Sequence, residues 1–108
     1  MPGRLFIKIF TITVTLLFLP GCCDKSRISE NINALYSPDA RVRNQATLDL
    51  ANCGSDAARA VPRLAELLYD PNVGVQSGAA FALNKIDTQE ARDIMDRAMQ
   101  AKRNRKTE

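Results

Sequence analysis

The sequence contains no histidine and no tryptophan. Histidine is the commonest general base in enzymes and the commonest protein ligand of transition metals. The chain also has no glycine-rich phosphate loop and no paired metal-ligand motif. We therefore expect no catalytic residues, no metal site and no enzyme activity. Alanine, leucine, arginine and aspartate are prominent instead, and this composition favours helices.

Excess charge is also scarce once the start of the chain is set aside. The formal net charge is +3, but Arg4 and Lys8 lie within the first ten residues. Without them, the 15 basic residues fall to 13, against 12 acidic ones. We therefore expect no nucleic-acid partner. The remaining basic cluster, "KRNRK", falls in residues 102–108, which we expect to form a disordered tail. Contact of this tail with anionic lipid headgroups is the alternative.

A long hydrophobic run is missing as well. Residues 9–19 form an uncharged stretch of eleven residues, whereas a helix that crosses a bilayer needs about 20. A short apolar stretch that follows a basic start and precedes a small residue is typical of an export signal. The sequence thus predicts a signal peptide over residues 1–21. An uncleaved, tilted membrane anchor is the alternative.

The motif "LPGC" at residues 19–22 sharpens this prediction. It resembles the lipobox of bacterial lipoproteins, although Pro20 departs from the usual small residue. The resemblance implies that Cys22 receives a covalent lipid and becomes the first residue of the mature chain. Several acyl chains on one residue hold a protein stably on a membrane. We then expect residues 22–27 to be a lipidated tether, with the protein at the bacterial cell envelope, facing the periplasm or the exterior. No other cofactor is expected.

An internal repeat organises the rest of the chain. Leu35, Tyr36, Pro38 and Val42 recur as Leu68, Tyr69, Pro71 and Val75, each 33 positions later. The similarity runs over roughly residues 28–99, and a period of this size is typical of repeat architectures. Helical spacing places apolar residues on one face of each unit: Val42, Ala46, Leu50 and Cys53, then Val75, Ala79, Leu83 and Ile86. The pattern predicts five antiparallel helices over 28–36, 39–53, 58–69, 72–86 and 89–101.

Local signals mark the ends of these helices. Ser37 and Asp70 are expected N-caps, each followed by a proline at the first helical position. Gly54 is expected to end the helix before it. Gly74 and Gly78 are expected to weaken the helix that contains them, by roughly 1 kcal/mol each relative to alanine.

The segment "SPDARVRNQATLDLANCGSDAARAVPRLAELLYDPNVGVQSGAAFALNKID" resembles the bacterial HEAT-like repeat of the phycobilisome lyase type. The "VR" step at residues 42–43 and "AVPRL" at 60–64 carry the resemblance. It implies an all-α fold, a short right-handed α-solenoid of HEAT-like helix pairs with about two and a half repeats in residues 28–101. It also implies that Arg43 contacts an acidic side chain of the next repeat. Gln76 stands in the equivalent position of the second unit, so that contact is in doubt there.

By the same resemblance, the second helix of each pair lines the inner surface of the solenoid. The candidate partner-binding residues on these helices are Arg59, Arg63, Glu66, Arg92, Asp96 and Met99. A solvated polar face explains the same residues. The last helix has few apolar residues and is expected to cap the array. In the alternative interpretation, Met95 and Met99 form a surface for a partner or for a second copy of the chain.

Cys53 occupies the position of Ile86 in the next unit, so we expect a buried thiol that acts as a small apolar residue. A disulfide with Cys23 is the less favoured alternative. The sequence as a whole predicts a membrane-anchored lipoprotein whose HEAT-like module binds an unidentified protein partner. The alternatives are an accessory protein of the cofactor-lyase type and a purely structural module that forms homodimers.

Overall fold

The computed structural model describes residues 23–108, and this part of the chain is built from helices without strands. The predicted signal peptide and Cys22 lie outside the described residues. The elements are α2 (Lys25–Ala34), α3 (Ala40–Asn52), the 3₁₀ helix η1 (Gly54–Ala60), α4 (Val61–Leu67), α5 (Val73–Ile86) and α6 (Gln89–Lys106). The predicted all-α fold is confirmed.

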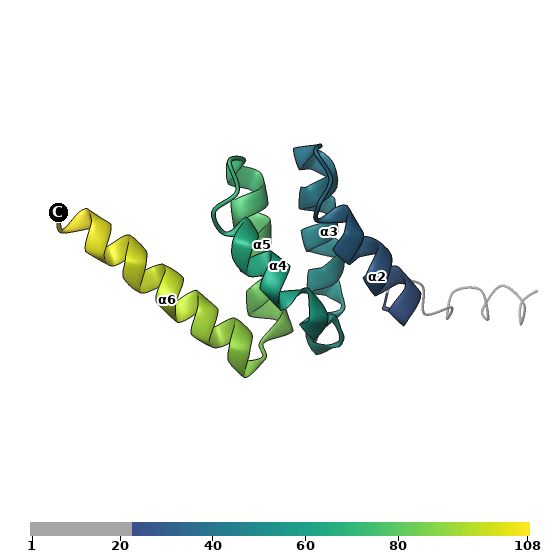
Figure 1. Cartoon of the computed structure of the whole chain (residues 1–108). Helices are drawn as coiled ribbons and strands as arrows, with labels where there is room; N and C mark the ends of the chain where they lie inside the picture. Colours follow the sequence, from purple (N-terminus) through teal and green to yellow (C-terminus); the bar gives the residue numbers. More distant parts are fainter. Residues whose placement is uncertain (1–22) are drawn as a thin grey trace, which may run out of the picture.

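Helices α3 and α5 form the centre of the molecule and make the most extensive contact between elements. Helix α2 packs on α3, whereas η1, α4 and α6 pack against α5 (Figure 1). From its start beside α5, helix α6 leads away from the other helices (Figure 1). The order α2, α3–α4, α5–α6 corresponds to a short solenoid of about two and a half units.

The core repeats with the predicted period. Leu50 and Leu83 lie 33 residues apart and are both fully buried, one in α3 and the other in α5. The expected apolar faces are buried as well, except at Val42. Val42 borders a shallow hollow between α2 and α3, because α2 does not cover the start of α3.

The corners at the ends of α3 and α5 also repeat. Gly54 follows α3 with φ +56°, and Asp87 follows α5 with φ 51°, exactly one period of 33 residues later in the sequence. This left-handed conformation is easy for glycine and uncommon for other residues. The corner of the first unit thus has a glycine, Gly54, which adopts this conformation without strain. The second unit uses an aspartate there, and Arg92 donates a hydrogen bond to its carbonyl oxygen at 2.9 Å.

The predicted N-caps at Ser37 and Asp70 are wrong by two residues. The caps of α3 and α5 are Asp39 and Asn72, whose side chains accept hydrogen bonds from backbone N–H groups of the first turn. Ser37 and Asp70 instead accept the N–H groups of those capping residues. The proline therefore lies in the turn before each helix. Pro62, by contrast, lies in the first turn of α4.

Three of the five expected helices differ from the structure by three residues or more at one end. The expected helix 58–69 is divided into η1 and the shorter α4. Helix α6 continues to Lys106, so residues 102–106, expected to be disordered, form its last turns. Basic side chains are favourable at the C-terminal end of a helix dipole, which is where these residues lie. Helix α2 begins at Lys25 with Asp24 as its N-cap, so little of the expected tether remains.

Gly78 lies at the closest approach of α3 and α5. A methyl group on this residue would overlap the Thr47 hydroxyl and lie 2.6 Å from Asn44 Oδ1. Thr47 is fully buried and donates a hydrogen bond to the Asn44 carbonyl oxygen at 2.6 Å, so it has little room to move. Gly78 therefore permits the two units to stack, and its effect on helix propensity is secondary.

We expect Gly78→Ala to lower the free energy of unfolding by roughly 1–3 kcal/mol, the range for overpacking a well-packed core. Urea denaturation followed by circular dichroism measures this change. The matched control is Ser77→Ala, which changes the exposed residue directly before Gly78 in α5. Its free energy of unfolding should stay near the wild-type value. If Gly78→Ala were as stable as Ser77→Ala, the close approach would not constrain the stack.

Candidate interaction surface

An ion pair joins the two repeat units at the corner between α4 and α5. Arg43 Nε donates to Asp70 Oδ2 at 3.0 Å, and Arg43 Nη2 donates to Asp70 Oδ1 at 3.1 Å. Both side chains are largely buried. Arg43 Nη1 also donates to the Ser37 carbonyl oxygen at 2.8 Å, which ties α3 to its own preceding corner. The predicted contact of Arg43 with an acidic residue of the next unit is confirmed.

The charge of Asp70 is stabilised by these contacts. Burial alone would raise the pKa of Asp70. The hydrogen bonds from the Arg43 side chain and the Asn72 N–H, together with the positive charge of Arg43, nevertheless lower the pKa below its usual value. Asp70 is therefore an ionised carboxylate in the folded protein at neutral pH.

Gln76, the equivalent of Arg43 in the second unit, makes one of the two contacts that Arg43 makes in the first. Its Nε2 donates to the Asp70 carbonyl oxygen at 2.6 Å, just as Arg43 donates to the equivalent carbonyl oxygen of Ser37. The link from the helix to its preceding corner is thus common to both units. The link to the following unit is made by the arginine.

Arg63 connects α4 with the corner after α2. Its guanidinium carbon lies 4.2 Å from the centroid of the Tyr36 ring, and its Nη2 donates to the Leu35 carbonyl oxygen at 3.2 Å. Its Nη1 pairs with Glu66 Oε2 at 2.6 Å. Arg63 therefore holds α4 against the corner that precedes α3, and Glu66 pairs with Arg63 within α4.

The other predicted contact residues lie on two elements, with Arg59 in η1 and the rest in α6. Arg92 donates to Asp87 at the start of α6, at the corner described above. The side chains of Arg59, Asp96 and Met99 are exposed. Met99 lines a groove together with Met95, and these are the two residues that the alternative interpretation of the last helix places on a surface for a partner. That these residues bind a partner stays a prediction.

The groove lies between α6 and the face of α5 that points away from α3. Its volume is about 520 Å³. The lining residues are Leu68, Tyr69, Val73, Gln76, Ser77, Ala80, Met95, Ala98, Met99, Lys102 and Arg105. The exposed fractions of Val73, Tyr69 and Met99 are 72%, 65% and 53%, so large apolar side chains face solvent here.

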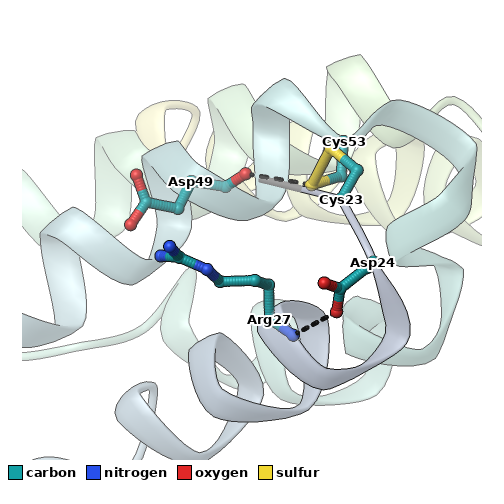
Figure 2. The surroundings of a disulfide bond; sticks show 5 residues. All are labelled: Cys23, Asp24, Arg27, Asp49 and Cys53. Atoms are coloured by element: carbon teal, nitrogen blue, oxygen red, sulfur yellow. Dashed lines mark hydrogen bonds between the residues drawn. A yellow bond between two sulfur atoms is a disulfide. The ribbon is translucent and has the colours of Figure 1, made fainter. Parts of the chain in front are cut away.

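A disulfide joins Cys23 to Cys53, across a sequence separation of 30 residues. Figure 2 shows the bond between Cys23, two residues before α2, and Cys53, directly after α3, with the carbonyl oxygen of Asp49 beside the Cys53 sulfur at 3.5 Å. The expected burial of Cys53 is confirmed, but the expected free thiol is wrong. Asp24 caps α2 by accepting the Arg27 N–H, and this cap turns the chain so that Cys23 reaches α3 (Figure 2).

The described part of the chain contains neither a membrane-spanning helix nor a cluster of metal-binding side chains. Within residues 23–108, no helix is both long and apolar enough to cross a membrane. The same residues contain no cluster of acidic, cysteine or histidine side chains suited to a metal ion.

Stacked helix pairs with a repeated corner and a shared core define the class of short helical-repeat proteins. The sequence profile of HEAT repeats matches residues 28–107, and the chain belongs to the HEAT repeat family. Searches among curated proteins and among solved structures found no match. HEAT repeats generally mediate protein–protein interactions, which directs attention to the uncovered surfaces of this array.

We expect Asp70→Asn to lower the free energy of unfolding by roughly 3 kcal/mol at neutral pH, because it leaves Arg43 buried without its charge partner. The pKa of Asp70 is lower in the folded chain than in the unfolded one. The ionised Asp70 side chain therefore contributes its full stabilisation of the fold above its pKa in the unfolded chain, about 3.9. This contribution is lost as the pH falls through the pKa of Asp70 in the folded chain. Urea denaturation between pH 7 and pH 3 should show a smaller loss for Asp70→Asn than for wild type.

The matched variants for this pair are Arg43→Gln, which copies the residue of the second unit, and the double variant. If the ion pair couples the units, the double variant should lose less stability than the two single losses added together. Strictly additive losses would contradict the coupling.

We expect Cys23→Ser to lower the free energy of unfolding by roughly 2–4 kcal/mol, because the disulfide restricts the unfolded chain. A thiol reductant should lower the melting temperature of wild type to that of the variant, and should leave the variant unchanged. Differential scanning calorimetry with and without reductant measures both effects. A wild-type melting temperature that does not respond to reductant would show that this bond contributes nothing.

Proposed function

We propose that the protein is an exported lipoprotein that presents its HEAT repeats to a protein partner at the bacterial cell envelope. The observation that carries the proposal is the disulfide between Cys23 and Cys53. Disulfides persist in oxidising compartments and are rare in the cytosol of most cells. A structural disulfide in a chain that begins with an export-signal pattern supports a location outside the cytoplasm, facing the periplasm or the exterior.

The number of cysteines supports the lipid attachment. The chain has three cysteines, and the disulfide uses Cys23 and Cys53. Cys22 is then the odd one, directly beside a disulfide with which a free thiolate would exchange. A thioether to diacylglycerol removes this thiol from exchange. The lipobox-like "LPGC" and the cysteine pairing therefore both support lipid attachment at Cys22.

The repeats themselves support binding without catalysis. We propose that they are of the phycobilisome lyase type, because Arg43 makes the contact between units that the resemblance implies. Within residues 23–108, the surface offers exposed apolar and charged side chains rather than a nucleophile next to a general base. We therefore assign the array no catalytic role and no cofactor apart from the lipid.

The test is the intact mass of the protein from the membrane fraction, for wild type and for Cys22→Ala. We expect wild type to lack residues 1–21 and to carry the added mass of the lipid. Cys22→Ala should show neither change. A further mass measurement after reduction and alkylation should add label to Cys23 and Cys53 alone in wild type.

Cys23→Ala is the matched control, since it changes the neighbouring cysteine. This variant should still be cleaved and lipidated, with Cys53 open to alkylation without reduction. A full-length wild-type chain without lipid would overturn the anchoring. A lipidated chain whose Cys23 and Cys53 alkylate without reduction would overturn the role of the disulfide.

A further inference from the structure

The face of α3 that packs on α5 has an equivalent face on α5, made by the residues 33 positions later in the sequence. In the described chain, α5 covers this face of α3, but no helix is stacked in the same way on the equivalent face of α5. In α3, Asn44 and Thr47 meet α5 at Gly78. The residues 33 positions later are Ser77 and Ala80, and these line the groove beside α6. The same period relates Arg43, which reaches the next unit, to Gln76 in the groove. The groove is thus the position at which one more helix would stack.

The side chains of this face are smaller than those of its covered counterpart. Ala80 replaces Thr47, and Ser77 replaces Asn44, so the floor of the groove lacks the two side chains that Gly78 has to avoid in the first unit. A helix with ordinary side chains can therefore approach α5 here. Around this floor, Val73, Tyr69 and Met99 offer apolar contacts of the kind that bury well in interfaces.

Helix α6 provides one wall of the groove and gives it a charge. The equivalent of α4 in the second unit ends near Gln100, but α6 continues to Lys106. This extension places Lys102 and Arg105 beside the groove, and none of the lining residues is acidic. An occupant with carboxylates next to its apolar surface would complement both parts of the groove.

We propose that the groove binds one amphipathic helix of a partner protein, with acidic residues flanking its apolar stripe. The apolar stripe packs on α5 and Met99, and the acidic residues face Lys102 and Arg105. This inference rests on the proposed role of the array in binding a protein. It does not depend on the lipid attachment, which the mass measurement tests separately.

The experiment uses the full chain, purified in a nonionic detergent, and two fluorescent helical peptides of the same length. Both peptides carry leucine along one face and alanine elsewhere, and the flanking positions hold glutamate in one and lysine in the other. Fluorescence anisotropy, with protein-free micelles as the blank, measures binding. We expect the glutamate peptide to bind about tenfold more tightly, since two partly exposed charge pairs distinguish the peptides.

The double variant Lys102→Glu with Arg105→Glu should reverse this preference. Lys25→Glu with Arg27→Glu changes the net charge equally on exposed residues of α2, away from the groove, and should leave the preference intact. Val73→Asp should weaken the binding of both peptides. Circular dichroism on each variant checks that the helices are retained.

Two results would overturn the proposal. The first is no binding at micromolar concentrations, or an effect of the α2 variant equal to that of the α6 variant. The second is a dimer in analytical ultracentrifugation that becomes a monomer in the Lys102→Glu, Arg105→Glu variant, because a second copy of the chain would then occupy the groove.

Discussion

The contact between α3 and α5 is the constraint on which the rest of the array depends. The absence of a side chain at Gly78 allows the two helices to approach until Thr47 is fully buried. Arg43 and Asp70 then lie close enough to pair across the units. A glycine is needed only where this contact occurs. The equivalent position in α3 is Gln45, which is exposed and packs against no such helix.

The two units are similar in backbone and different in their links. Both bond the helix to its preceding corner, through Arg43 in the first unit and Gln76 in the second. The first unit adds a charged link to its successor, whereas the second presents small and neutral side chains at the same face. The exposed face of the second unit is therefore distinct from the covered face of the first. Its charge comes from the extension of α6.

Periodicity was sufficient to predict the helices and most of the core, because burial on one face repeats every three or four residues. It could not predict that the central α3 also buries Thr47 and Ala51. A helix between two neighbours has two buried faces, and the second contains small or polar residues. Gly78 was therefore read as a weak point of its helix, although its role depends on the neighbouring helix. The N-caps were misplaced because Ser37 and Asp70 bond the turn, which has the same residue types as a cap.

The candidate site was predictable where the repeat pattern carries the information. The contact of Arg43 followed from the resemblance, but its particular partner Asp70 required the structure. The groove depends on the length and direction of α6, and the apolar spacing of this helix ends before Lys102. The disulfide was disfavoured because the segment before α2 was expected to be a loose tether. The cap at Asp24 instead fixes its direction.

The disulfide also determines how a mechanical force would enter the fold. A pull on the chain before Cys23 is transmitted through the bond to Cys53 at the end of α3. Helices α2 and α3 both lie inside the closed covalent loop of residues 23–53 and carry none of this load, so neither is peeled from the array. The load passes from Cys53 into η1, and the strength of the fold under tension is set by the packing of η1, α4 and α6 against α5.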